Sequence, residues 1–307
     1  MSSDPIPIVI DCDPGHDDAI AIMLALGSPE VELRAVTTVS GNAPLQQTTA
    51  NAIRVLDHVG RSDVPVAAGA DRPLVRDPYP QGEVHGESGL DGPDLPPPGR
   101  APLEAHAVDV IAEIATSSDR PVTLIAIGPL TNVAIFVARH PEAAAALERV
   151  VVMGGSIGLG NVTPAAEFNI WGDPEAARRV FTSGLHVTMV GLDVTQKALF
   201  TGEQNERMRP RGRAAALAAE LVDYYRRAHP RVGGTPIHDA VAVAQVVKPE
   251  LLTLAHCHVE VDCGPVSRGR TLVDLRCVTA GQPNVHVATD VAPAFNDLMA
   301  DRIASLG

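Results

Sequence analysis

Apolar and polar positions alternate along the chain in two different rhythms. Short apolar runs have the pattern of buried strands, and segments between them repeat apolar residues every three or four positions, as helices do. Strands are therefore predicted at 6–11, 31–40, 64–69, 122–128, 149–155 and 186–193, and helices at 17–27, 44–60, 103–118, 130–147 and 173–183. This alternation predicts an α/β fold with an open, mostly parallel sheet flanked by helices around a Rossmann-like core.

The other stretches depart from this alternation. Residues 70–102 are rich in Pro, Gly and Asp and are predicted to form a long irregular segment, of a kind that is often functional. Beyond residue 203 the chain is expected to be largely helical through 230 and over 238–247, with short strands within 256–290 and a last helix at 292–305. No repeat or linker is visible, so a single domain over residues 1–307 is predicted.

Composition excludes several classes of protein. Apolar residues make up 45% of the chain and charged residues 20%, as in a soluble globular protein. A net charge of −13 and only 3% aromatic residues argue against binding to nucleic acid. No stretch has the length and apolarity of a membrane span, and no signal peptide is visible at the N-terminus. The four cysteines form no CxxC pair, which favours reduced thiols and a cytoplasmic location.

Polar side chains gather after the predicted strands, where the carboxyl ends of parallel strands form ligand sites. They are mainly carboxylates, amides and hydroxyls: Asp11, Asp13, Asp17, Asp18, Ser40, Asn42, Thr131, Asn132, Asn161, Glu167, Asn169 and Asp193. Neither lysine nor arginine is among them, which argues against a phosphate site. An oxygen-rich cluster without basic groups suits a hard divalent cation such as calcium, and no Cys/His spacing indicates zinc.

The stretch "DCDPGHDD" holds four of these aspartates within eight positions. Asp11 and Asp13 lie two apart at a strand end and share one face. Gly15 is expected to permit a sharp turn that folds Asp17 and Asp18 back towards Asp13. Carboxylates in the first turn of a helix are usually caps, but capping needs only one or two of the four. The excess negative charge favours a bound cation.

A series of motifs resembles the inosine-uridine preferring nucleoside hydrolase family. These motifs are "DCDPGHDDAIAI", "TTVSGN", "VPVAAGA", "VHGESGLDG", "GPLTN", "VVMGGS", "GNVTPAAEFNIWGDPEAA", "VTMVGLDVT" and "IHDAVAVA", in the family's order from about residue 6 to 247. The resemblance implies a nucleoside hydrolase-like fold, a tightly bound calcium ion, and hydrolysis of the N-glycosidic bond of purine or pyrimidine ribonucleosides to ribose and free base. It also suggests a homodimer or homotetramer.

The same resemblance implies roles for individual residues. Calcium would be held by Asp13, Asp18, Asp239 and the backbone carbonyl of Thr131. Asp13 would also be the general base towards a calcium-bound water, and His238 the acid that protonates the leaving base. Substrate contacts are implied for Asp17 and Asn42 near the ribose 2′-hydroxyl, Asn161 and Glu167 at the 5′-hydroxyl, Asn169 at the 3′-hydroxyl, Met153 and Phe168 along the sugar, and His85 and Tyr225 at the base pocket. Asp11 matches a carboxylate behind the ligands.

Several of these residues have simpler explanations when taken alone. Asp239 and Thr131 begin predicted helices and match helix caps, and Asn42 fits turn chemistry. His229 stands where the family often carries a second tyrosine, and His16 is interpreted as a turn residue at the edge of the site. Two other functions stay open. One is a nucleoside- or sugar-binding protein of the same fold without turnover, and the other is a metal-dependent phosphoesterase, which would need a cationic phosphate clamp.

Overall fold

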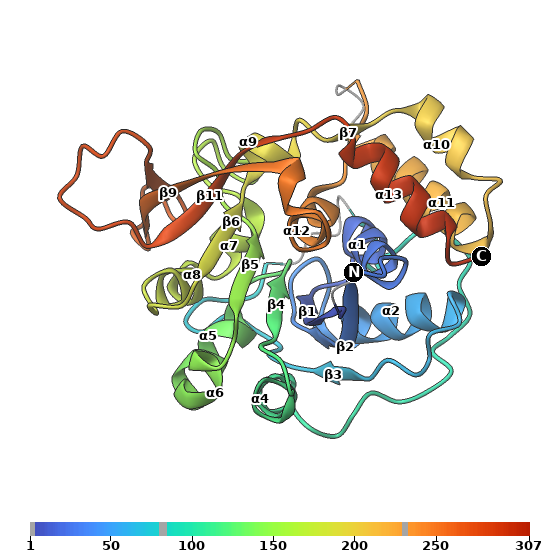
Figure 1. Ribbon diagram of the computed structural model, residues 1–307, viewed down its shortest axis with the longest axis horizontal. Coiled ribbons are helices and arrows are strands. Elements are labelled where there is room, and N and C mark those ends of the chain that lie inside the picture. Colours follow the sequence, from blue (N-terminus) through green and yellow to red (C-terminus); the bar gives the residue numbers. More distant parts are fainter. Residues whose placement is uncertain (1–3, 80–84, 229–232) are drawn as a thin grey trace.

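A long, twisted sheet forms the centre of the computed structural model, which describes residues 4–79, 85–228 and 233–307 (Figure 1). Its strands in the described part of the chain are β1 (Ile6–Cys12), β2 (Val31–Thr38), β3 (Val66–Ala68), β4 (Thr123–Ala126), β5 (Arg149–Met153), β6 (Val187–Val190), β9 (Leu252–Val261), β10 (Thr271–Asp274) and β11 (Val285–Val291). Their order across the sheet is β10–β9–β11–β6–β5–β4–β1–β2–β3.

Strand direction places the functional edge of this sheet. The strands from β11 to β3 are all parallel, while β9 and β10 add an antiparallel edge. The predicted mostly parallel sheet is therefore confirmed. The chain places β2 and β3 on one side of β1 and then returns to β4 on the other side. The carboxyl ends of β1 and β4 flank this change of direction, which is where open α/β sheets bind ligands.

Helices cover both faces of the sheet because its strands are apolar on both sides. In β1, Ile8 and Ile10 pack into one core while Val9 packs into the other. The first core is formed with α1 (His16–Leu26), α2 (Leu45–His58), α11 (Arg213–Ala228), α12 (His238–Val247) and α13 (Phe295–Ala304). The second is formed with α4 (Ala107–Ser117), α5 (Thr131–Arg139), α6 (Pro141–Ala145) and α8 (Pro174–Phe181). Figure 1 shows α1 and α12 on one side of the central strands and α4, α5 and α6 on the other.

Two predicted segments differ from the structure. The helix expected over 130–147 is divided into α5 and α6 at His140, because Pro141 has no N–H to continue the helical hydrogen bonds. Between the predicted strand 149–155 and the predicted helix 173–183, where no helix is predicted, the structure has a short helix, α7 (Phe168–Gly172). Glu167 caps α7 by accepting hydrogen bonds from the backbone N–H groups of Asn169 and Ile170, so a polar loop residue starts a helix that periodicity does not reveal.

The remaining elements are short and lie between β6 and β9 in the sequence. They are α9 (Leu192–Thr195), the two-stranded sheet β7 (Leu199–Phe200) and β8 (Thr235–Pro236), α10 (Gly202–Met208) and a 3₁₀ turn (Pro249–Leu251). The chain is thus largely helical from α10 to α12, as predicted, before β9, β10 and β11 complete the sheet. Among the helices that the structure describes, none combines the length and apolarity needed to cross a membrane.

Candidate active site

Three buried aspartates meet at the carboxyl end of β1. Asp17 and Asp18 lie in the first turn of α1, and Asp239 lies in the first turn of α12, which packs beside α1. One carboxylate oxygen from each of the three lies within 4.8 Å of the others. Such a set of hard oxygen donors can hold a divalent cation.

Asp18 also holds the turn between β1 and α1. Its two oxygens accept hydrogen bonds from the backbone N–H groups of Asp13 at 3.1 Å and Gly15 at 3.0 Å. The amide of Asn42 donates to the same carboxylate at 3.2 Å, and the Asn42 backbone N–H donates to Asp13 Oδ2 at 2.7 Å. Asp13 Oδ1 is buried and has no hydrogen-bond partner among the described residues. The turn therefore folds Asp18 back towards Asp13, as expected, and leaves one Asp13 oxygen for a ligand.

Glycines make room for these carboxylates. A Cβ at Gly41 would lie 2.0 Å from Asp13 Oδ2, and one at Gly128 would lie 2.6 Å from Asp13 Oδ1. At Gly15 a Cβ would lie 2.6 Å from His85 Nδ1. The backbone of Gly15 is extended, with φ −99°, which any residue can adopt. The turn expected at Gly15 is present, and the glycine is needed there for space and not for a special backbone conformation.

Burial changes the acid–base properties of the cluster. Loss of hydration and then repulsion from Asp18 raise the pKa of Asp17 to about 8. The pKa of Asp239 is raised well above its ordinary value by burial, with repulsion from Asp17 and Asp18. The pKa of Asp13 is raised for the same reasons, burial first and Asp18 second. A cation would relieve the repulsion, so the electrostatics favour the donor set that the geometry provides.

Two neighbouring carboxylates act as supports. Asp11 lies behind the cluster, where its Oδ1 accepts hydrogen bonds from Thr37 Oγ1 at 2.6 Å and Asn132 Nδ2 at 2.8 Å. Burial raises the pKa of Asp11 to about 7. Asp173 accepts a hydrogen bond from Thr131 Oγ1 at 2.7 Å, so the Thr131 side chain is engaged away from the aspartates. This contact fixes the Thr131 side chain at the start of α5, next to the backbone carbonyl for which a ligand role is predicted.

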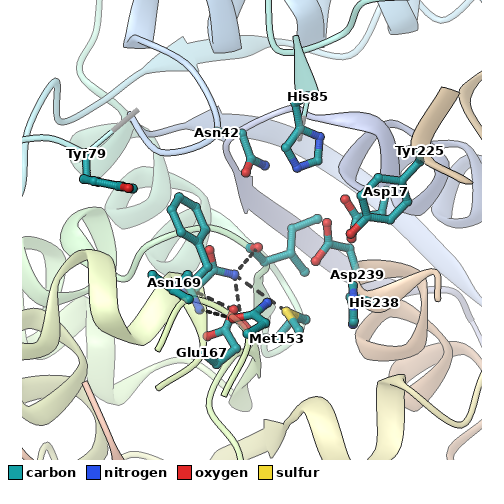
Figure 2. A pocket seen from close by; sticks show the side chains of 14 residues that line it. Asp17, Asn42, Tyr79, His85, Met153, Glu167, Asn169, Tyr225, His238 and Asp239 are labelled. Carbon is teal, nitrogen blue, oxygen red and sulfur yellow. Dashed lines mark hydrogen bonds between the residues drawn. The ribbon is translucent and has the colours of Figure 1, made fainter. Parts of the chain in front are cut away.

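The cluster opens on a pocket of about 330 Å³. Figure 2 shows the lining side chains, with Asp17, Asp239 and Tyr225 on one side of the pocket and Glu167 and Asn169 on another. They are Asp17, Asn42, Tyr79, His85, Ile127, Met153, Asn161, Val162, Glu167, Phe168, Asn169, Tyr225, His238 and Asp239. Lysine and arginine are absent from these described lining residues.

One wall of the pocket is held by backbone hydrogen bonds around Glu167. Its Oε2 accepts from Gly155 N–H at 2.9 Å, and its Oε1 accepts from Asn169 N–H at 2.9 Å. Burial raises the pKa of Glu167 to about 7. The amide of Asn169 donates to the carbonyls of Ile127 at 2.8 Å and Met153 at 3.1 Å, as the dashed lines in Figure 2 show. These contacts fix both polar side chains before any ligand binds.

The opposite wall carries two histidines and a tyrosine. His238 is the first residue of α12, and its Nδ1 lies 2.7 Å from Thr195 Oγ1. His85 and Tyr225 have ring centroids 5.5 Å apart in a stacked arrangement. Burial raises the pKa of Tyr225, so its hydroxyl stays protonated. This wall therefore presents aromatic faces, ring nitrogens and the protonated hydroxyl of Tyr225.

Every residue that the sequence assigns to substrate contact lines this pocket, and so do His238 and Asp239. Asp13, Asp18 and Thr131 are buried and do not line it. Sequence reasoning missed Tyr79, Ile127 and Val162. Tyr79 belongs to the irregular segment 70–102, whose length was the available signal, whereas nothing in the sequence distinguishes Ile127 from other strand residues. His229 lies outside the described residues.

Fold and pocket together define an α/β protein with a carboxylate-rich site for a small, polar ligand at the switch point of its sheet. Residues 8–296 match the model of the family described as inosine-uridine preferring nucleoside hydrolase. The chain therefore belongs to this family. The predicted class of enzyme, an N-glycosidase that hydrolyses ribonucleosides, is confirmed by this membership.

Similar proteins agree with this assignment over almost the whole chain. A pyrimidine-specific ribonucleoside hydrolase RihA from Citrobacter koseri is 47% identical over 97% of this chain and 98% of its own length. Among solved structures, a purine-preferring ribonucleoside hydrolase from Gardnerella vaginalis has a TM-score of 0.92 and 33% identity, with 98% of each chain covered. An inosine-guanosine nucleoside hydrolase has a TM-score of 0.89 and 31% identity, with 97% of this chain and 98% of that chain covered.

Proposed function

We propose that this protein hydrolyses the N-glycosidic bond of pyrimidine ribonucleosides with the help of a calcium ion. The buried cluster of Asp17, Asp18 and Asp239 at the floor of the pocket carries this proposal. A cluster of this kind stabilises positive charge, which is what an oxocarbenium-like transition state develops on the sugar. The pocket volume of about 330 Å³ is suited to a small molecule such as a nucleoside.

Calcium would be held by Asp13, Asp18, Asp239 and the carbonyl of Thr131. When bound, it would lower the pKa of water and screen the carboxylates from one another. Asp13 is the proposed general base, because its Oδ1 has no hydrogen-bond partner within the described part of the chain. The N–H of Asn42 holds the other oxygen and so fixes the direction in which Asp13 takes a proton from water.

The ribose would be bound by the polar side chains of the pocket. Asp17 and Asn42 are proposed to receive the 2′-hydroxyl, Asn169 the 3′-hydroxyl, and Glu167 and Asn161 the 5′-hydroxyl, with Met153 and Phe168 along the sugar. The Asn169 amide nitrogen already donates to two carbonyls, so its oxygen is the atom available to accept from a hydroxyl. Asn161 Oδ1 accepts from Phe168 N–H at 3.0 Å, which places the two residues together.

The leaving base would be received by the aromatic wall. His238 is the proposed acid, and its hydrogen bond with Thr195 fixes the ring orientation through Nδ1. His85 and Tyr225 would contact the base. Pyrimidine preference is proposed from the relatives named pyrimidine-specific, which are 47% identical, whereas the solved structures named for purine nucleosides are 33% and 31% identical.

The test is release of free base from uridine, cytidine, inosine, adenosine and guanosine, each with calcium and with a chelator. We expect uridine and cytidine to be hydrolysed at least about tenfold more efficiently than the purine nucleosides, a difference of ~1.4 kcal/mol in transition-state binding. The chelator should abolish turnover. Binding of nucleosides by calorimetry without release of base would instead indicate a non-catalytic binding protein.

Two further properties belong to this proposal. A homodimer or homotetramer is proposed from the family resemblance, and light scattering of the purified protein would measure it. A cytoplasmic location is proposed from cysteine usage, since the four cysteines are all free thiols.

A further inference from the structure

His16 lies at the centre of a stack of aromatic rings beside the pocket. Its ring centroid is 4.7 Å from that of Tyr224, with the planes 4° apart, and 5.3 Å from that of His85. Tyr225 stacks at 6.1 Å from the same ring. His16 is completely buried and does not line the pocket, whereas His85 does. His16 was expected to be a turn residue at the edge of the site. The structure corrects this, because His16 lies behind His85.

Hydrogen bonds determine where the hydrogens of this pair lie. His16 Nε2 is 2.8 Å from the backbone carbonyl oxygen of Asp91, and His16 Nδ1 is 3.0 Å from His85 Nδ1. A carbonyl oxygen only accepts, so His16 carries its hydrogen on Nε2. The Nδ1 of a neutral His16 is then an acceptor, and the hydrogen between the two rings must come from His85 Nδ1.

A third contact competes with this arrangement. The backbone N–H of His16 points at His85 Nδ1 from 3.3 Å. An Nδ1 that carries a hydrogen cannot accept it, so the two contacts exclude each other in a neutral pair. The side-chain contact is the shorter of the two, at 3.0 Å against 3.3 Å, and giving it the hydrogen means that the His16 N–H, which has no partner within the helix, has no acceptor at His85. We therefore assign the hydrogen to His85 Nδ1.

The anchor of His16 is itself rigid. The carboxylate of Asp91 accepts hydrogen bonds from the backbone N–H groups of Glu87 at 3.0 Å and Ser88 at 3.2 Å, and from the Ser88 hydroxyl. Gly92, with φ +119°, brings the chain against Tyr224, where a Cβ would lie 2.9 Å from the ring. The turn that follows His85 is thus closed on itself and presents the Asp91 carbonyl to His16.

We propose that His16 is a positioning residue that fixes both the ring and the tautomer of His85, with hydrogen on Nδ1, and so sets how the pocket meets the leaving base. This rests on the proposed function, in which His85 contacts the base. An Nδ1–H on His85 makes its Nε2 a hydrogen-bond acceptor. His85 then accepts from the base, and the donation of a proton to the leaving group is left to another residue, for which His238 is proposed.

Two variants separate hydrogen bonding from packing. His16→Phe retains an aromatic ring against Tyr224 but loses both nitrogens, while His16→Asn loses the ring but offers an amide oxygen near the position of Nδ1. We expect His16→Phe to lower kcat/KM for uridine by at least about tenfold, the loss of ~1.4 kcal/mol. His16→Asn should recover most of that loss. Both variants should keep near-normal activity on a nitrophenyl riboside, whose leaving group needs no contact with His85. His256→Phe, which makes the same substitution on an exposed part of β9, serves as the control.

The outcomes divide clearly. If His16 has only a structural role, His16→Phe should be more active than His16→Asn, because phenylalanine fills the space of the histidine ring better. That result would overturn the proposal, and so would equal losses of activity on uridine and on the nitrophenyl riboside. Nitrogen-15 NMR of the wild-type histidines gives a readout that does not need turnover. Hydrogen on His85 Nδ1 supports the proposal, and hydrogen on Nε2 overturns it. If the wild-type protein releases base from no nucleoside, the proposed function fails while the NMR result still tests the His16–His85 pair.

Discussion

At the scale of single residues, Asp13 combines two features that a general base needs. One oxygen is held by Asn42 N–H at 2.7 Å, and the other is buried without a partner among the described residues. Its raised pKa, caused by burial and then by Asp18, gives it affinity for a proton in the absence of a cation. The first feature comes from Asn42, in the loop after β2, so the motif around Asp13 contains only part of what a general base needs.

Asp13→Asn should therefore separate chemistry from folding. The amide oxygen can still accept from Asn42 N–H, but the side chain cannot take a proton from water. We expect kcat on uridine to fall by at least about 10²-fold in saturating calcium, with a melting temperature no lower than that of the wild type. Asp4→Asn, at an exposed position, is the matched control. Wild-type turnover by Asp13→Asn would remove Asp13 from the mechanism.

At the scale of elements, Asp173 joins three segments of the chain. Its carboxylate caps α8 through Ala176 N–H at 3.0 Å, accepts from Leu74 N–H at 2.8 Å and receives the Thr131 hydroxyl at the start of α5. The backbone carbonyl of Thr131 is a proposed calcium ligand. The side chain that caps α8 therefore also helps to place a ligand at the start of α5. Nothing in the sequence predicts this link, since Asp173 reads as an ordinary cap before Pro174.

Asp173→Ala should lower the free energy of unfolding by about 2–4 kcal/mol, because it removes a cap and leaves buried donors without acceptors. Urea denaturation measures this loss. Thr131→Val removes only the hydroxyl and should cost about 1 kcal/mol. Calcium affinity should fall in both variants, since both release the start of α5. A free energy of unfolding for Asp173→Ala equal to that of the wild type would show that these contacts contribute nothing.

Elements also show where sequence patterns end. Alternating strands and helices predict the parallel sheet, because periodicity reports burial on one or both faces. The same patterns missed the break at Pro141 within an otherwise apolar helix and the helix α7, which is only five residues long. Both errors arise where a single local feature, a missing N–H or a capping carboxylate, outweighs periodicity. Such features are visible in the sequence but compete with many similar residues that have no effect.

At the scale of the whole molecule, the site depends on contacts between distant segments. Asp239 reaches Asp17 and Asp18 because α12 packs against α1, and His16 at the start of α1 contacts both His85 and the backbone carbonyl of Asp91. The proposed metal ligands and most of the residues that line the pocket were available from the sequence through the family resemblance. The aromatic stack around His16 was not, since residues in three separate segments have no shared pattern until the chain folds.

The buried aspartates should make the stability of the molecule depend on calcium and on pH together. Asp17 has a pKa raised to about 8 by burial and by Asp18, against about 4 for an unfolded chain. A raised pKa contributes stability that is full below the unfolded pKa and is lost as the pH rises through the folded pKa. In a chelator, the melting temperature should therefore fall between about pH 5.5 and about pH 8.5.

Calcium should act in the opposite direction, because it binds the deprotonated carboxylates in competition with protons. At a hundred times its Kd it would add ~2.7 kcal/mol, or several degrees in melting temperature. This gain should be larger at about pH 8.5 than at about pH 5.5, as thermal unfolding with calcium and with a chelator would measure. Asp239→Asn should lose the gain, and Glu113→Gln, at an exposed position of α4, should keep it. A gain that is equal at both pH values, or a melting temperature in chelator that rises with pH, would mean that these carboxylates do not retain protons in the folded state. The absence of any gain would mean that they do not bind the ion.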